Sequence, residues 1–268
     1  MNREPMRSGD QTERGSDRCG MRGRQETGQA TMVEDGESVI LDLLGQHRIL
    51  RHLPAPALGA LVRGASVQRV ADRGVIFRQG DEGRSVLAVI EGYVKLSSST
   101  AAGREVVLEV AGPGNVFGEV AVLNNWPRAA DALALSPARL LAIDGRAFMR
   151  ALQDAPTALM EVARLLSERL RRATEQLTDS VDMPAAARIA KALIQLAGLH
   201  SHPVRGGLRI DLALSQRELG AMTGLTRESI NKHLSAWRDA NYVTFNDGAI
   251  TLVNLSALRD LLQDPMLA

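Results

Sequence analysis

Residues 215–240, SQRELGAMTGLTRESINKHLSAWRDA, predict two short helices joined by a tight turn. Ser215 and Glu218 form a capping box, since each side chain can bond the other residue's backbone amide and so start the first helix. Gly224 ends this helix, because glycine enters the left-handed conformation at little cost. Thr226 then caps a second helix, whose apolar residues recur at helical spacing. These residues, which predict one buried face, are Ile230, Leu234 and Trp237.

The opposite face of the second helix is polar and consists of Arg227, Glu228, Asn231 and Lys232. Such side chains can hydrogen-bond base edges from a helix that lies in the major groove of DNA. The alternative is a plain pair of helices in which Glu228 and Lys232 form a solvated i,i+4 ion pair. The cap, the glycine turn, the apolar triplet and the polar face together favour a helix-turn-helix that binds double-stranded DNA. The residues expected to contact DNA are Ser215, Arg217, Thr226, Arg227, Glu228, Asn231 and Lys232.

Length and composition limit the class of protein. The chain of 268 residues is long enough for about two domains. A formal net charge of +1 gives no global attraction to nucleic acid, so affinity for DNA must come from local Arg and Lys side chains. The single cysteine, Cys19, excludes an internal disulfide and a four-cysteine metal site within one chain. No apolar run of 18 residues and no apolar leader are present, so we expect no membrane span, no secretory signal and a cytoplasmic protein.

The first 36 residues are polar, lack aromatic residues and show no periodicity, so we expect a disordered tail. Arginines and acidic residues interleave there, which favours a solvated tail over a basic arm. From Ser38 the pattern becomes helical. Between about residues 67 and 143 it changes to short β-rich segments, separated by turns at Gly80, Gly92 and Gly114, which predict an all-β sandwich or barrel. The expected strands span residues 66–70, 75–78, 85–90, 93–98, 105–110, 128–135 and 138–143.

A long helix is predicted after Pro156, and Met183 and Pro184 end it. Its apolar residues repeat with alternating spacings of four and three, which is typical of a heptad seam. The stripe could instead pack against the β region of its own chain, but its length and charged flanks favour a parallel coiled coil across a dimer. The seam residues are Leu159, Ala163, Leu166, Leu170, Ala173, Leu177 and Ser180.

The segments around the two DNA-reading helices complete the predicted domain. Residues 185–198 predict a helix, and residues 200–207 predict a loop. After the second DNA-reading helix, residues 242–245 and 250–253 flank Asn246-Asp247-Gly248, which is typical of a β-hairpin. Such a hairpin would form the wing of a winged helix-turn-helix.

The β region contains a candidate ligand site in VFGEVAVLNNWPRAADALA, residues 116–134. Backbone amides beside Gly118 and the guanidinium of Arg128 could hold a phosphate, and the Glu119 carboxylate could accept from a sugar hydroxyl. The alternative is that Glu119 and Arg128 form a salt bridge with each other. Spacing alone leaves both open.

These features together resemble the CRP/FNR superfamily of bacterial transcription regulators. The resemblance rests on the glycine-punctuated β region, the Phe117-Gly118-Glu119 segment, Arg128 nine residues after the glutamate, the long helix and the winged helix-turn-helix. It covers about residues 40–255 and implies an α+β fold. The implied units are a tail (1–36), a cyclic-nucleotide-binding-like β-roll of jelly-roll type (37–155), a dimerisation helix (156–183) and a winged helix-turn-helix DNA-binding domain (184–268).

The resemblance also implies a function. A homodimer would bind a pseudo-palindromic operator, and its β-roll would either sense an effector or act without a ligand. RNA polymerase is the implied partner if the protein is an activator, and residues 200–207 occupy the place where the cyclic AMP receptor touches the polymerase.

The implied effector is cyclic AMP or another cyclic nucleotide. In cyclic-AMP-responsive members, the residues matching Gly118, Glu119 and Arg128 bind the ribose and the cyclic phosphate, and Arg169 matches an arginine near the same pocket. Ala129 departs from the pattern, because nucleotide binders usually carry a Ser or Thr hydroxyl at this position. One missing hydrogen bond to a charged group would weaken binding about 10- to 100-fold.

A second departure concerns the base. Ala173 and Thr174 match a polar pair that meets the adenine in cyclic AMP receptors, so only the Thr174 hydroxyl is kept.

On the recognition helix, the family pattern reads a half-site containing GTG with an Arg-Glu pair and a later Arg. Arg227 and Glu228 are kept, and Lys232 replaces the later arginine. Arg227 is expected to bind guanine, Glu228 to accept from a cytosine amino group, and Lys232 to contact guanine or a phosphate.

Two other classes of function are weighed against a regulator. A cyclic-nucleotide-binding module without direct DNA control, attached to a kinase or channel, is disfavoured by the helix-turn-helix. An enzyme with a jelly-roll active site would need clustered His or carboxylate metal ligands in the β region, and the sequence has none, so no enzymatic activity is expected. An iron-sulfur cluster is not expected, since the relevant cysteines are absent. A haem is not expected either, since no histidine lies between His52 and His200.

Overall fold

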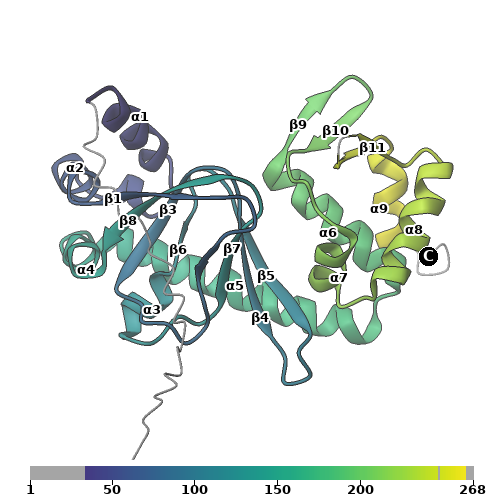
Figure 1. Ribbon diagram of the computed structural model, residues 1–268, viewed down its shortest axis with the longest axis horizontal. Coiled ribbons are helices and arrows are strands. Elements are labelled where there is room, and N and C mark those ends of the chain that lie inside the picture. The colour runs from purple at the N-terminus through teal and green to yellow at the C-terminus, as the bar shows by residue number, and fades with distance from the viewer. Residues whose placement is uncertain (1–33, 247, 264–268) are drawn as a thin grey trace, which may run out of the picture.

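The computed structural model describes residues 34–246 and 248–263, and it consists of a β-roll and a helical C-terminal domain joined by one long helix (Figure 1). This arrangement confirms the predicted α+β fold. Residues 1–33 of the predicted tail, with Cys19, lie outside the described residues. The first helix, α1 (Glu34–Gly45), begins before the predicted start at Ser38.

Two four-stranded antiparallel sheets form the β-roll. The strand order of the first is β1 (Ser66–Val70), β8 (Ala138–Asp144), β3 (Ser85–Glu91) and β6 (Val116–Phe117). The order of the second is β2 (Val75–Phe77), β7 (Asp131–Ala134), β4 (Val94–Ser99) and β5 (Glu105–Ala111). Apolar side chains from both sheets, with Phe117 among them, pack in the buried core between them.

The seven predicted strands all form, but β2 ends one residue earlier than expected and β7 is four residues shorter. Strand β7 begins at Asp131 rather than at Arg128, because the Arg128 backbone bonds the turn at Gly80 and Asp81 instead of a strand. Strand β6 and the short helix α3 (Glu119–Asn124) are additional to the predicted elements. The predicted glycine turns are confirmed by positive φ angles of 90° at Gly80, 81° at Gly92 and 82° at Gly114.

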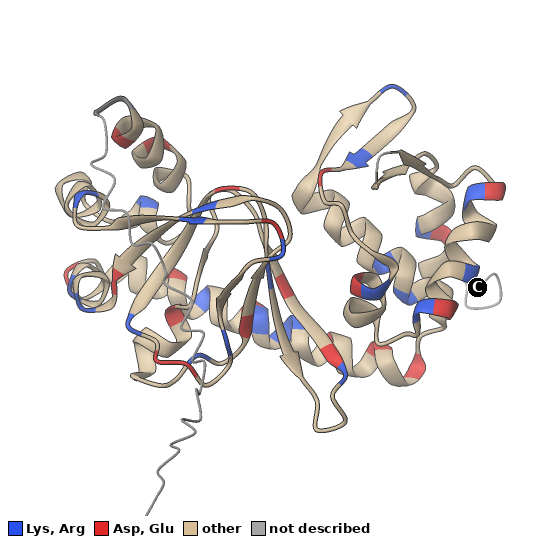
Figure 2. Ribbon diagram, in the orientation of Figure 1, with Lys and Arg blue, Asp and Glu red and all other residues tan. Residues whose placement is uncertain are grey.

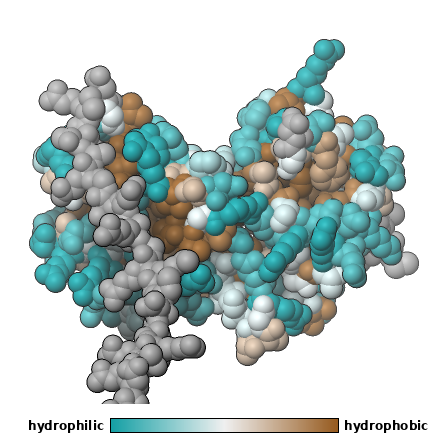
Figure 3. Space-filling view, in the orientation of Figure 1, coloured by the Kyte–Doolittle hydropathy of each residue, from teal (hydrophilic) through white to brown (hydrophobic). Residues whose placement is uncertain are grey.

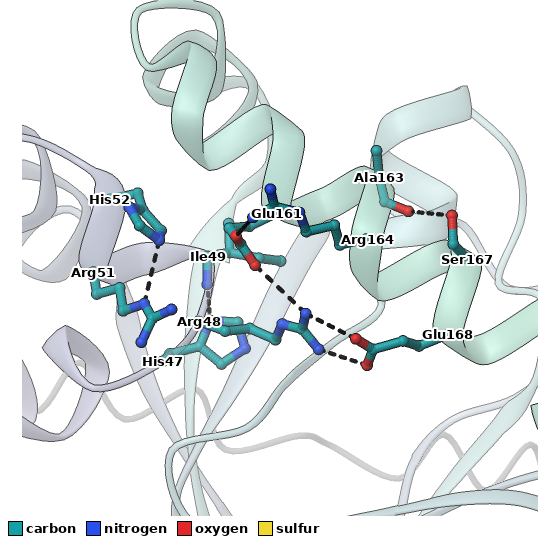
Figure 4. Close-up of polar contacts among 10 residues, drawn as sticks. All are labelled: His47, Arg48, Ile49, Arg51, His52, Glu161, Ala163, Arg164, Ser167 and Glu168. Carbon is teal, nitrogen blue, oxygen red and sulfur yellow. Dashed lines mark hydrogen bonds and ion pairs between the residues drawn. The ribbon is translucent and has the colours of Figure 1, made fainter.

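Helices cover one side of the β-roll. They are α1, the 3₁₀ turn η1 (Leu50–His52), α2 (Ala55–Arg63) and α4 (Gly145–Gln153). The segment between α1 and η1 is tied to the long helix α5 (Pro156–Asp182) by Arg48, which donates to both Glu168 carboxylate oxygens at 2.7 and 3.1 Å (Figure 4). The β-roll, its helices and the first half of α5 therefore form one packed unit.

Helix α5 has two different apolar faces. Ala158, Val162 and Leu165 are buried against the β-roll and its helices. The predicted seam lies on another face and is exposed: 49% for Leu159, 70% for Leu170 and 71% for Leu177. The alternative that this stripe packs against its own β region is therefore wrong, because that contact uses a different set of residues.

The C-terminal domain surrounds α6 (Ala185–His200) and contains α7 (Gln216–Thr223) and α8 (Arg227–Asp239). A four-stranded sheet lies beside them, in the order β11 (Val243–Asn246), β12 (Ala249–Leu252), β10 (Gly207–Ile210) and β9 (Ser201–Val204). The predicted wing is thus present as β11 and β12. Helix α9 (Leu255–Gln263) lies outside the predicted elements and packs on α6.

The prediction of a loop at residues 200–207 is wrong. His200 ends α6, residues 201–204 form β9, and Gly207 starts β10 after a two-residue turn. The two strands pair from Gly207 with Val204 to Ile210 with Ser201. Strand β9 carries no alternating apolar pattern, and it forms because it pairs with β10, which is itself held by β12. Pro203 is tolerated because β9 is the edge strand.

The two domains are in contact in this structure. Strand β5 packs against α7, and Val107, Val110 and Leu135 of the β-roll belong to the same apolar cluster as the core of the C-terminal domain. Figure 3 shows a mostly hydrophilic surface, with an apolar patch over the β-roll and a notch between the two lobes. No helix within the described ranges is both long and apolar enough to cross a membrane.

Candidate DNA-binding surface and effector pocket

The helix-turn-helix begins with the predicted capping box. The Ser215 hydroxyl accepts from the Glu218 amide at 3.2 Å, and the Glu218 carboxylate accepts from the Ser215 amide at 2.8 Å. Gly224 ends α7 with a left-handed φ of 70°. Thr226 caps α8 by accepting from the Ser229 amide at 3.2 Å. Each predicted local signal is confirmed.

The crossing of α7 over α8 depends on Gly220, which the sequence analysis does not single out. A Cβ atom at Gly220 would lie 2.7 Å from the carbonyl oxygen of Leu225, so a larger residue would force the turn away from α7. Arg188 of α6 also donates to the Thr223 carbonyl at 3.1 Å and fixes the end of α7. Neither contact has a local sequence signal, because each depends on how the helices cross.

Helix α8 buries Ile230, Leu234 and Trp237 and leaves the predicted reading face exposed. Arg227, Glu228, Asn231 and Lys232 all lie on this exposed face, and neither basic residue forms an ion pair with another described residue. Asn231 accepts from Gln216 at 3.0 Å, which links the reading face to the start of α7. The face can therefore present its donors and acceptors to base edges.

The remaining predicted DNA contacts lie at helix N-termini. Ser215 and Arg217 are exposed at the start of α7, and Thr226 is exposed at the start of α8. Helix N-termini attract anions such as phosphates, because their amides are free and the helix dipole is positive there. Figure 2 shows basic and acidic residues interleaved over both domains, so affinity for DNA has to arise from this local arrangement rather than from a wholly positive face.

A cavity of about 170 Å³, partly open to solvent, lies at the predicted effector site. Its walls are mostly apolar, and its charged lining comes from β5, α3, the segment before β7, and α5. The lining brings together Gly118, Glu119, Arg128, Ala129 and Arg169, five of the six predicted effector residues. It also includes Phe77, Leu96, Leu108, Glu109, Val120, Ala121 and Ala130.

Arg128 is a buried cation without a carboxylate partner among the described residues. It is 5% exposed, and it donates to the Gly118 carbonyl at 3.0 Å and to the Ser85 hydroxyl at 3.1 Å. Its guanidinium lies 4.3 Å from the centre of the Phe77 ring, and its Nε is buried without a partner. Burial lowers the pKa of Arg128, although the carboxylates of Glu119 and Asp81 oppose this. An anion in the cavity would supply the missing counter-charge.

Glu119 forms its ion pair with Arg169 rather than with Arg128. The alternative of a direct Glu119–Arg128 salt bridge is therefore wrong. Arg169 also pairs with Glu109 of β5 at 2.9 Å. Glu119 is 1% exposed, and its Oε2 is buried without a partner, so a ligand hydroxyl could donate to it.

Thr174 is the one predicted effector residue that the structure places outside this cavity. It is exposed on α5, and its hydroxyl donates to the Leu170 carbonyl of the preceding turn at 3.0 Å. Phe77, Ser85 and Glu109 are functional candidates that the sequence reading missed. Their roles depend on pairing between distant strands, so no local pattern could have found them.

A second cavity, of about 270 Å³, lies on the other side of Arg169 and is lined by His47. Burial, followed by the charges of Arg48, Arg169 and Arg51, lowers the pKa of His47 from 6.5 to about 4. Figure 4 shows His47 beside Arg48, with Arg51 on the same segment. The folded protein therefore holds His47 neutral in the range where an unfolded chain would protonate it.

His47→Gln should reduce the loss of stability on acidification. Below pH 6.5 the unfolded chain gains a proton at His47 that the folded chain takes up only near pH 4. The free energy of unfolding therefore decreases by up to about 3 kcal/mol as the pH is lowered from 6.5 to 4. The check is the free energy of urea unfolding at several pH values from 7 to 4, with His52→Gln as the control. A profile for His47→Gln that runs parallel to the parent's would contradict this prediction.

Among the described residues, no group of three or more His, Cys, Asp or Glu side chains is placed to hold a metal ion.

Two family models match the chain. Residues 67–155 match the cyclic nucleotide-binding domain, and residues 187–261 match the Crp-like helix-turn-helix domain. Together these matches cover the β-roll and the DNA-reading helices described above.

Relatives share this arrangement. The Cyclic AMP receptor protein of Thermus thermophilus is 30% identical over 69% of this chain and 83% of its own length. The CRP-like cAMP-activated global transcriptional regulator of Mycobacterium tuberculosis is 26% identical over 79% of this chain and 94% of its own length. A solved CRP-family transcriptional regulator from Thermus thermophilus superposes with a TM-score of 0.61 at 27% identity, covering 74% of this chain and 97% of that one.

Proposed function

We propose a mode of action for this chain, which belongs to the CRP/FNR superfamily of DNA-binding transcription regulators. It works as a cytoplasmic homodimer, in which the exposed seams of two α5 helices pack together. The dimer binds a pseudo-palindromic operator, with one C-terminal domain on each half-site. As an activator it would also contact RNA polymerase. The observation that carries this proposal is the exposed polar face of α8.

Each predicted contact has a role in this proposal. Arg227 binds guanine through two hydrogen bonds, Glu228 accepts from a cytosine amino group, and Asn231 and Lys232 contact neighbouring bases or phosphates. Phosphates bind at the starts of α7 and α8 through Ser215, Arg217 and Thr226. A cyclic-nucleotide-binding module without direct DNA control is disfavoured, because such a module does not require the exposed polar face of α8.

The β-roll cavity receives an anionic effector that also carries a hydroxyl, and a cyclic nucleotide fits this description. Arg128 has no carboxylate partner within the described part of the chain and lines the cavity, so it supplies the phosphate site together with the backbone at Gly118. The unpaired Oε2 of Glu119 accepts from a ribose hydroxyl. Arg169 holds Glu119 in place. The methyl group of Ala129 supplies no donor, and this predicts modest affinity.

The test is fluorescence anisotropy of the full-length protein on a labelled DNA fragment from upstream of its own gene, with and without cyclic AMP. The measurement is repeated at two salt concentrations, since phosphate contacts make affinity fall as salt rises. Salt-dependent binding that prefers this fragment over unrelated DNA supports the regulator. Equal affinity for both fragments at every nucleotide concentration would contradict it.

Substitutions in the cavity should change the nucleotide response in opposite directions. Arg128→Met should abolish the response without unfolding the protein, because it removes a buried cation that pairs with no carboxylate of residues 34–246 or 248–263. Ala129→Ser should tighten nucleotide binding about tenfold, because it restores one hydroxyl donor. Isothermal titration with cyclic AMP gives both affinities, and thermal unfolding checks the fold. Equal nucleotide affinity in the parent and Arg128→Met would rule out this site.

A further inference from the structure

An ion pair between residues far apart in the chain joins the two domains. Arg73, in the turn between β1 and β2, pairs with Glu218 of α7. The Arg73 side chain is 45% exposed, but that of Glu218 is only 5% exposed. Burial alone would raise the pKa of Glu218, but the hydrogen bonds from Ser215 and the ion pair with Arg73 together hold it below its ordinary value. The Glu218 carboxylate, which caps α7, is thus also the group through which α7 binds the β-roll.

The turn that carries Arg73 is held in an unusual conformation. Arg73 has a φ of 59°, a left-handed value that few residues other than glycine adopt. Its amide donates to the Ala134 carbonyl at 3.1 Å, and the Gly74 carbonyl accepts from the Ala134 amide at 2.9 Å. Strand β7 therefore fixes the turn, and the fixed turn places Arg73 at the start of α7.

Apolar and aromatic contacts complete the interface. Val107 and Val110 of β5 are buried in the cluster that also holds the core of the C-terminal domain. The Tyr93 ring meets the His200 ring edge-on, with 5.4 Å between their centres. His200 Nε2 lies 3.2 Å from the Val110 carbonyl oxygen. The ion pair thus adds to a contact that is also packed by apolar and aromatic side chains.

The same contact involves the first helix of the helix-turn-helix. In this motif the first helix crosses the backbone while the second enters the major groove. Here β5 packs along that first helix, α7. Strand β5 also carries Glu105, which pairs with Lys95 at 2.6 Å. The helix that has to cross the DNA backbone is thus held against the β-roll.

We propose that Arg73 latches the C-terminal domain onto the β-roll and that this closed arrangement lowers affinity for DNA until the latch opens. The proposal rests on the proposed function and names a means of regulating it. Strand β5 links the latch to the effector cavity. Leu108 and Glu109 line that cavity, while Val107 and Val110 contact the C-terminal domain. An effector that draws Arg169 away from Glu109 would therefore act on the strand that α7 packs against.

The test compares Arg73→Glu with Arg139→Glu in the full-length protein. Arg139 is a suitable control, because it lies on the β-roll, is 37% exposed and pairs with Glu91. Both variants change the net charge equally and lose an ion pair to a glutamate, and Arg73→Glu also loses a longer contact, of 3.9 Å, with its neighbour Asp72. In the absence of DNA, exchange of the backbone amide hydrogens of β5 and α7 should be faster in Arg73→Glu than in the parent, and unchanged in Arg139→Glu. Without effector, Arg73→Glu should also bind the operator fragment about three- to tenfold more tightly than Arg139→Glu. Arg73→Lys, which keeps the charge, should behave like the parent.

The outcomes separate the latch from the proposed function. Unchanged exchange in β5 and α7 would overturn the latch, whatever the affinity for DNA. Faster exchange without tighter binding would overturn its inhibitory role. If the parent and all variants failed to prefer the operator fragment over unrelated DNA, the proposed function would fail, while the exchange data would still decide whether Arg73 holds the domains together.

Discussion

Leu170→Glu combined with Leu177→Glu is expected to convert the protein into a monomer and to weaken operator binding by about 100-fold or more. The two leucines are seven residues apart, so they occupy the same position of the heptad seam on α5. Both are about 70% exposed in the single chain, at 70% and 71%. Two glutamates facing their copies in a partner helix would replace apolar contact with charge repulsion. A dimer bound to two half-sites gains about 10²- to 10⁴-fold over one domain alone, and a monomer loses this gain.

Light scattering after gel filtration measures the oligomeric state, and anisotropy measures the affinity for DNA. Leu199→Glu is a matched control, because Leu199 is 69% exposed on α6 and lies outside the seam. The control should remain a dimer with the parent's affinity. A double variant of the seam that still ran as a dimer would show that the α5 seam is not the dimer interface.

Arg227→Ala is expected to cost about 1 to 3 kcal/mol of binding free energy per half-site and to relax the preference at one base pair. Arg227 follows the cap of α8 directly, so its side chain lies at the end of the recognition helix that enters the groove first. It has no ion-pair partner among the described residues, and its removal therefore leaves no buried charge behind. The loss should come from the missing pair of hydrogen bonds to guanine.

Selection of binding sites from random DNA measures the base preference, and anisotropy on the selected site measures the affinity. Arg238→Ala provides the comparison within the same helix, since Arg238 lies in its last turn and pairs with its neighbour Asp239. It should keep the selected sequence. An operator preference identical between Arg227→Ala and the parent would remove Arg227 from base recognition.

The sequence predicted correctly those features that depend on residues close together in the chain. The Ser215–Glu218 box, the left-handed Gly224 and the Thr226 cap each involve residues within four positions of one another. The heptad seam was equally visible, because helical periodicity places its residues on one face whatever the helix packs against. These signals were enough for the α+β fold and for the reading face of α8.

Only the tertiary structure decided which distant residues meet. The cassette of Gly118, Glu119 and Arg128 was recognisable, but spacing could not show that Glu119 pairs with Arg169, fifty positions away. It also could not show that residues 201–204 form a strand, since β9 pairs with β10, which is itself held by β12. The ion pair of Arg73 with Glu218 spans 145 positions. Local signals act through caps, backbone angles and periodicity, whereas these long-range contacts exist only once the strands have paired and the two domains have packed together.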